Sequence, residues 1–156
     1  MQLQTSKTLH CDVAIIGAGI NGCLSAYMLH QRGLNVVLFD SDGVAAGGSG
    51  AAGAFIAPKI SKDGPLKEIM EVAYRFALEF YTSHFPNQIS ILPLLHLAKD
   101  EEDVIKINSF KRTTTIPFEE MFEFQDISHD SGVYFPESGI VKAQELCNEL
   151  VKNIRV

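Results

Sequence analysis

The sequence has few cysteines and no long apolar segment. Cys11, Cys23 and Cys147 lie far apart and form no CxxC pair, which argues against a disulfide framework or a cysteine-based zinc site, so no metal is predicted. The longest apolar runs have about six or seven residues, far fewer than the roughly 20 that cross a membrane. The first ten residues contain no basic segment followed by an apolar one, so no signal peptide is predicted. These absences predict a cytoplasmic protein without membrane contact.

The sequence also lacks an excess of positive charge. It contains 13 Lys and Arg residues against 19 Asp and Glu residues, which gives a net charge of −6. This balance argues against a protein that holds nucleic acid by bulk electrostatics alone, although a local basic patch is compatible with it. With 156 residues, of which 46% are hydrophobic and 21% charged, the chain is long enough for one domain with a hydrophobic core.

Two apolar runs near the N-terminus flank a helical segment. Residues 12–16 (DVAII) show no alternation and predict a buried strand of a parallel sheet. Residues 20–32 carry apolar side chains at helical spacing and end at Gly33, a natural helix stop, and residues 34–39 (LNVVLF) predict a second strand. A strand, a helix and a strand within about 30 residues predict a βαβ unit with a right-handed crossover.

The turn between the first strand and the helix carries a GxGxxG motif. Gly17 permits a tight turn, Gly19 lets the backbone approach a pyrophosphate, and Gly22 lets the helix pack closely on the strand. Asp40 ends the second strand 18 positions after Gly22, where an acidic residue typically binds ribose hydroxyls. A carboxylate there repels a 2′-phosphate, so FAD or NAD is favoured over NADP. The predicted dinucleotide-binding residues are Gly17, Ala18, Gly19, Ile20, Asn21, Gly22 and Asp40. The alternative is a glycine-rich turn that only joins strand and helix.

A loop rich in Gly, Ala and Ser follows over residues 41–58. The segments DVAIIGAGINGCLSAYMLHQRGLNVVLFD and GGSGAAGAFIAP together resemble the D-amino-acid-oxidase-like family of FAD-dependent oxidoreductases. The resemblance implies FAD as the cofactor and a loop beside its pyrophosphate, where small residues expose backbone amides and a hydroxyl adds a donor. It adds these cofactor-binding residues: Ser41, Gly48, Ser49, Gly50 and Ala54. The alternative is a flexible surface linker.

Residues 66–84 show the strongest helical pattern in the chain. One face is apolar and is expected to be buried, whereas Glu68, Glu71, Arg75 and Glu79 are expected to face solvent. The apolar face comprises Leu66, Ile69, Met70, Ala73, Phe76, Ala77 and Phe80. The shorter elements expected after it are a strand at 89–98 that Pro93 confines to an edge or a bulge, helices at 99–111 and 142–153, a strand at 133–135, and the start of another strand at 154–156. The helix at 142–153 is predicted to have one apolar face, formed by Ala143, Leu146, Cys147, Leu150 and Val151.

Two further segments, AFIAPKISKDGPLKEIMEVAYRFALEFY and GVYFPESGIVKAQELCNEL, resemble the FAD-dependent part of the bifunctional tRNA 5-methylaminomethyl-2-thiouridine enzymes. This resemblance implies oxidation of a secondary amine C–N bond, with loss of a carboxymethyl group from a modified wobble uridine of tRNA. It also implies that Lys62 binds a carboxylate or phosphate of the substrate, and a solvated loop lysine is the alternative. The alternative functions are oxidation of a small amino acid (glycine, sarcosine or a D-amino acid) and non-catalytic nucleotide binding.

We therefore expect an α/β, Rossmann-like FAD/NAD(P)-binding fold with part of an inserted α+β substrate domain. The expected division is an FAD-binding part at 1–88, part of the substrate domain at 89–135, and an incomplete return to the FAD-binding domain at 136–156. The methyltransferase of the bifunctional enzymes is not expected here, because the first strand begins close to Met1. The C-terminal portion of the flavin domain is expected to be missing, with the catalytic residues beyond Val156 and the fragment inactive by itself.

Overall fold

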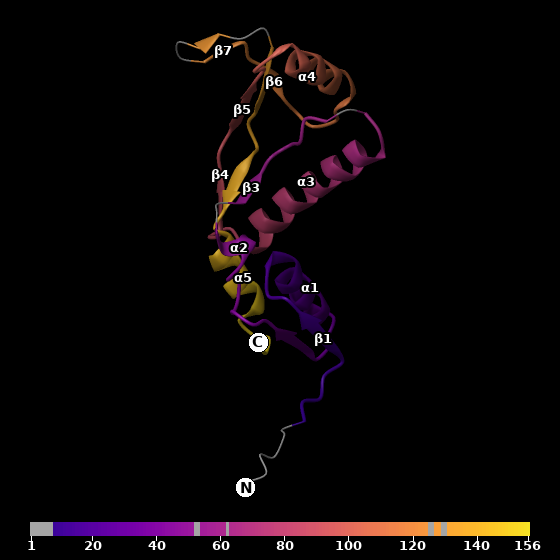
Figure 1. Ribbon diagram of the computed structural model, residues 1–156, viewed down its shortest axis with the longest axis vertical. Coiled ribbons are helices and arrows are strands. Elements are labelled where there is room, and N and C mark those ends of the chain that lie inside the picture. The colour runs from indigo at the N-terminus through magenta and orange to yellow at the C-terminus, as the bar shows by residue number, and fades with distance from the viewer. Residues whose placement is uncertain (1–7, 52–53, 62, 125–126, 129–130) are drawn as a thin grey trace. The chain divides into compact units, whose positions relative to one another are not determined.

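The structure of the protein is a computed structural model (Figure 1). It describes residues 8–51, 54–61, 63–124, 127–128 and 131–156. No helix within these ranges is long and apolar enough to cross a membrane.

The chain divides into two compact units. The first is formed by Met1–Ala52 together with Ala143–Val156, and the second by Gly53–Lys142. This division follows packing and assigns no role to either unit, so the functional domains expected at 1–88, 89–135 and 136–156 stay a prediction.

The first unit contains the predicted βαβ arrangement. Strands β1 (Val13–Ile16) and β2 (Val36–Phe39) pair in parallel, and helix α1 (Ile20–Gln31) connects them. The expected third strand also begins here, because the amide of Leu38 donates to the carbonyl of Arg155 at 2.9 Å and Arg155 forms a parallel bridge with Val37. The prediction of an α/β, Rossmann-like fold is confirmed.

Helix α5 (Ala143–Val151) packs on α1 and closes the core of this unit. Its buried side chains are those of the predicted apolar face, namely Ala143, Leu146, Cys147, Leu150 and Val151. Cys23 of α1 is fully buried beside them. Hydrogen bonding to Cys147 and burial raise the pKa of the Cys23 thiol, so this thiol stays protonated and acts as a packing residue.

The second unit consists of small antiparallel sheets and two helices, α3 (Pro65–His84) and α4 (Glu101–Thr113). The strand orders are β3-β10-β4 and β5-β9-β6, and β7 pairs with β8. The strand bounds are β3 (Ala54–Ile56), β4 (Ile89–Ile91), β5 (Leu94–Leu97), β6 (Glu119–Glu120), β7 (Glu123–Phe124), β8 (Ile127–Ser128), β9 (Gly132–Phe135) and β10 (Gly139–Val141). Its core includes Ile107 and Phe110 of α4 and Phe135 of β9, where the rings of Phe110 and Phe135 meet edge to face.

Several elements differ from the predictions, and for the strands the reason is a pairing partner that is distant in the sequence. The loop expected over 41–58 contains a short helix, α2 (Gly48–Ala51), and strand β3. Strand β3 forms because β10, more than 80 residues away in sequence, supplies its partner, which no local pattern reveals. The single strand expected at 89–98 is two strands, β4 and β5, which separate at Pro93 and join different sheets. Strand β10 itself was not predicted.

Helix α3 has the predicted extent, but part of its predicted orientation is wrong. Glu68, Arg75 and Glu79 are exposed as predicted, whereas four of the seven residues of the predicted apolar face are exposed as well. Its buried residues are Lys67, Glu71, Tyr74 and Phe80. Of the large apolar residues expected in the core, Phe80 is buried and Met70 is half-buried, whereas Leu66, Ile69 and Phe76 keep 58% to 64% of their surface accessible. The expectation that Glu71 faces solvent is therefore wrong, because this carboxylate finds hydrogen-bond donors inside the unit.

Candidate dinucleotide-binding site

The turn between β1 and α1 has a backbone that only glycine adopts easily. Gly17 has a φ angle of +102°, in the region that side chains with a Cβ rarely enter, and its amide donates to the carbonyl of Phe39 at 2.7 Å. At Gly22, a Cβ atom would lie 1.8 Å from the carbonyl oxygen of Gly17. Helix α1 can pack this closely on the turn only because Gly22 has no side chain.

The carboxylate of Asp40 lies against this turn. One oxygen accepts a hydrogen bond from the amide of Ala18 at 2.7 Å, and the other accepts from the amides of Asp42 at 2.9 Å and Gly43 at 3.1 Å. These bonds, with that from Ala18 the strongest, lower the pKa of Asp40, so it is ionised at neutral pH. The Asp40 oxygen that accepts from the Ala18 amide has a second lone pair, which can accept a hydrogen bond from a further donor such as a ribose hydroxyl.

The loop after β2 folds back onto the same turn. The amide of Ala45 donates to the carbonyl of Ala18 at 2.9 Å. The hydroxyl oxygen of Ser49 accepts from the amide of Ile20, the first residue of α1, at 3.0 Å. Ser49 therefore caps α1 from a distant position, and its own hydroxyl hydrogen has no acceptor among the described residues, so it can be donated to an anion.

Ser49 is expected to stabilise the unit through this contact. Replacing Ser49 with alanine should lower the free energy of unfolding by about 1 kcal/mol, the usual cost of losing a helix N-cap hydroxyl. Chemical denaturation followed by circular dichroism measures this change. Ser41→Ala is the control, because the Ser41 hydroxyl contacts only the exposed carboxylate of Asp42 among the described residues. Equal stability of the two variants would contradict the capping role.

The N-terminus of α1 suits an anion. Its N-cap is Gly19, which has no side chain to cap the helix, and its first turn contains no acidic residue. Asn21 and Gly22 have backbone amides without an acceptor among the described residues. Free amides and the positive end of the helix dipole bind phosphate groups, so these residues fit a dinucleotide pyrophosphate.

Four of the five remaining predicted residues lie within the described ranges. Gly48 and Gly50 lie in α2, and Ser41 is exposed with its hydroxyl donated to Asp42. Ala54 begins β3 in the second unit, and Lys62 lies outside the described residues. Sequence reasoning missed the amides of Asp42, Gly43 and Ala45, because the residue types there carry no signal for their role as backbone donors.

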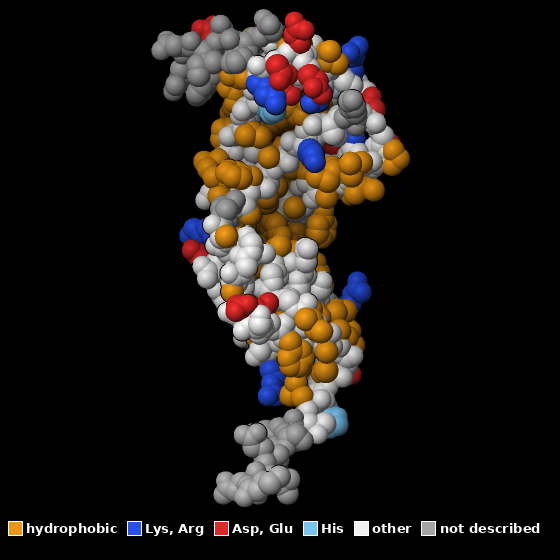
Figure 2. All heavy atoms as spheres, viewed as in Figure 1, with side chains coloured by type: hydrophobic (Ala, Val, Ile, Leu, Met, Phe, Trp, Pro, Cys, Tyr) orange, Lys and Arg blue, Asp and Glu red, His pale blue; other side chains and the backbone are white. Residues whose placement is uncertain are grey.

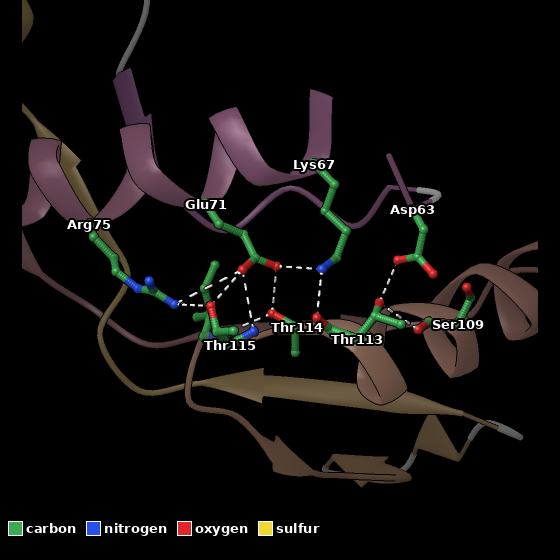
Figure 3. Close-up of polar contacts among 9 residues, drawn as sticks. Asp63, Lys67, Glu71, Arg75, Ser109, Thr113, Thr114 and Thr115 are labelled. Carbon is green, nitrogen blue, oxygen red and sulfur yellow. Dashed lines mark hydrogen bonds and ion pairs between the residues drawn. The ribbon is translucent and has the colours of Figure 1, made fainter. Parts of the chain in front are cut away.

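A second polar cluster joins α3 to the segment that follows α4 (Figure 3). The ammonium group of Lys67 contacts one carboxylate oxygen of Glu71 at 2.9 Å and donates to the carbonyl of Thr113 at 2.9 Å. The hydroxyls of Thr114 and Thr115 each donate to Glu71 at 2.8 Å. Lys67, Glu71, Thr113 and Thr115 border a pocket of about 400 Å³. The polar groups of this cluster bond to one another, and these bonds determine which face of α3 is buried.

Known proteins match the chain along most of its length. The family model described as FAD dependent oxidoreductase (DAO) matches residues 12–155. The tRNA 5-methylaminomethyl-2-thiouridine biosynthesis bifunctional protein MnmC of Psychrobacter sp. (strain PRwf-1) is 28% identical over 153 residues, which cover 90% of this chain and 20% of that protein. The protein of the same name from Leptospira interrogans serogroup Icterohaemorrhagiae serovar copenhageni (strain Fiocruz L1-130) is 43% identical over 72 residues, 46% of this chain and 11% of that one.

The fold is also shared with solved flavoenzymes. Glycine oxidase from Geobacillus kaustophilus superimposes with a TM-score of 0.68 at 20% identity, over 90% of this chain and 43% of that chain. The chain thus spans about a fifth of the Psychrobacter relative and less than half of the glycine oxidase. The family resemblance of the N-terminal motif and the loop after it is confirmed, and this chain belongs to the DAO family of FAD-dependent oxidoreductases.

Proposed function

We propose that the first unit holds FAD and that the protein serves the oxidation of a secondary amine in the carboxymethylaminomethyl group of a tRNA wobble uridine. The observation that carries the cofactor site is the convergence of the glycine turn, the Asp40 carboxylate and the Ser49 hydroxyl within one compact unit. The tRNA substrate is suggested by the name of the curated relatives. A tRNA substrate would also place the protein in the cytoplasm.

Each group at the site has a distinct part in holding FAD. The amides of Asn21 and Gly22 would donate to the pyrophosphate, and Ser49 would donate its hydroxyl hydrogen to a phosphate oxygen. Asp40 would accept from a ribose hydroxyl while Ala18 keeps the carboxylate in place. FAD itself supplies the redox chemistry, as the acceptor of a hydride from the carbon beside the amine nitrogen, and the protein supplies orientation and electrostatics.

Asp40→Asn is expected to weaken FAD binding ten- to a hundredfold. An amide has one acceptor oxygen in place of two, so it cannot accept hydrogen bonds from the Ala18 amide, from the amides of the following loop and from a ribose hydroxyl at the same time. Hydrogen bonds to a charged group contribute about 1.5–3 kcal/mol, which the neutral amide would lose in part. Quenching of FAD fluorescence on titration measures the affinity. Asp42→Asn is the matched control, because the Asp42 carboxylate contacts only the hydroxyl of Ser41 among the described residues.

The absorption spectrum of the purified protein tests cofactor binding directly. Flavin bands, either as purified or after addition of FAD, support the assignment. A colourless protein that takes up no FAD would overturn it and would favour a non-catalytic remnant of the fold. Equal affinities of the Asp40 and Asp42 variants would remove Asp40 from the site without touching the family membership.

The substrate is tested in cells. Deleting the gene should cause carboxymethylaminomethyl nucleosides to accumulate in tRNA digests, because their oxidation is lost. If the nucleosides do not accumulate, the tRNA substrate is wrong. The purified protein with FAD is then assayed with glycine, sarcosine and D-amino acids, since the fold is shared with a glycine oxidase.

A further inference from the structure

Helix α3 presents an apolar stripe to solvent. We define the α3 stripe as Leu66, Ile69, Val72 and Phe76, whose exposed fractions are 64%, 64%, 65% and 58%. These positions recur every three or four residues, so they lie along one side of the helix over about 15 Å. Figure 2 shows hydrophobic side chains gathered along this helix. An isolated exposed leucine needs no explanation, but an aligned row of large apolar side chains marks a contact surface.

The opposite face of the helix prevents the stripe from turning inward. Lys67 and Glu71, 5% and 7% exposed, are paired with each other and bonded to the backbone or hydroxyls of residues 113–115. The hydroxyl of Tyr74 donates to the carbonyl of Glu137 at 2.7 Å. Rotating α3 to bury its apolar side would break these bonds and leave the buried polar groups without partners, and breaking a buried ion pair alone typically costs about 3–5 kcal/mol. The stripe therefore stays outside the second unit.

We propose that the α3 stripe is the docking surface for the part of the oxidoreductase fold that the relatives carry outside the matched region. That part is large: the chain covers 43% of the glycine oxidase and 20% of the Psychrobacter relative. The occupant is an apolar polypeptide surface, because the stripe itself offers no charge or hydrogen-bonding group. Family membership alone supports this step, which is independent of the substrate.

The size of the stripe favours this occupant over a second copy of the chain. Four side chains exposed to this degree present on the order of 400–500 Å², about half of the roughly 800 Å² that each partner buries in a stable complex of separate proteins. A stripe of this area suits a segment that is held beside α3 by further contacts of the same fold. Such a segment gains the apolar contact without depending on it alone.

Ile69→Glu tests the docking surface, with Ile105→Glu as its matched control. Both residues are isoleucines on exposed helix faces, at 64% on α3 and 69% on α4. The chain is co-expressed with a segment of the Psychrobacter relative from outside the matched region, which leaves about four fifths of that protein to choose from. The original chain and the Ile105 variant should co-purify with this segment, and Ile69→Glu should reduce the co-purified amount at least tenfold.

Light scattering and thermal melts of the chain alone complete the test. All three forms should be monomers with the same melting temperature, because neither isoleucine is buried in the chain by itself. A dimer that Ile69→Glu dissociates would assign the stripe to a second copy and overturn the inference. Absence of co-purification, or equal loss with both variants, would overturn it as well. None of these readouts involves FAD or tRNA, so the outcome is separate from that of the proposed function.

Discussion

Replacing Gly22 with alanine is expected to destabilise the first unit by about 3 kcal/mol or more and to abolish FAD binding. Alanine is intrinsically the better helix residue by about 1 kcal/mol, so propensity alone predicts the opposite sign. The added methyl group would lie 1.8 Å from the carbonyl oxygen of Gly17. A Cβ atom has no rotatable bond of its own, so neither it nor the backbone carbonyl can move unless the backbone moves. Helix α1 would have to move away from the turn, and overpacking of this kind typically costs 1–3 kcal/mol and sometimes more.

Chemical denaturation and FAD titration measure the two parts of this effect. The control is Gly47→Ala, in the loop after β2, where an added methyl group meets nothing within 4 Å and φ lies outside the left-handed region. The control should keep its stability within about 0.5 kcal/mol, as is usual for surface substitutions. If Gly22→Ala were as stable as the control, the close approach of helix and turn would not be needed, and the reason given for the third glycine would be wrong.

The βαβ unit could be predicted because its determinants are local in sequence. Two short apolar runs, the helical spacing between them and Gly17 at the turn each specify structure within a few residues. The position of Asp40 beside the turn follows from the same geometry, since parallel neighbouring strands bring their carboxyl ends together. The buried face of α5 was predicted for the same reason, because all the apolar residues of this short helix lie on one side of it.

The orientation of α3 could not be predicted, because it depends on partners more than 40 residues away. Periodicity shows that the helix has an apolar side, but it does not show whether the chain supplies anything to cover that side. Lys67 and Glu71 are buried only because Thr113, Thr114 and Thr115 provide matching groups. Strand β3 was missed for a related reason, since its three residues form a strand only beside β10, which lies more than 80 residues away in the sequence.

Replacing Glu71 with alanine is expected to lower the free energy of unfolding by about 3–5 kcal/mol. The substitution leaves the ammonium group of Lys67 buried without its counter-ion, and an uncompensated buried charge carries a cost of that order. It also removes the acceptor of the Thr114 and Thr115 hydroxyls. Chemical denaturation measures the loss. Glu68→Ala, an exposed position on the same helix, is the control and should change stability by less than about 0.5 kcal/mol.

The same carboxylate should make the stability of the protein depend on pH. Burial by itself raises the pKa of Glu71, but hydrogen bonds from Lys67, Thr115 and Thr114 outweigh it and lower the pKa to about 2. Because the pKa in the folded state lies below the ordinary value of 4.5, the carboxylate stabilises the fold fully above pH 4.5. This contribution, about 3 kcal/mol, is lost as the pH falls from 4.5 to 2.

A double substitution separates the charge pair from the shape of the side chains. In Lys67→Met/Glu71→Leu, no charge is left buried, and apolar replacements of buried ion pairs are often neutral or stabilising. We therefore expect the double variant to recover most of the stability that Glu71→Ala loses, and to lose less stability between pH 4.5 and pH 2 than the original chain. A double variant as unstable as Glu71→Ala would mean that the hydroxyls of residues 114 and 115 dominate. The ion pair would then not be what holds the inner face of α3.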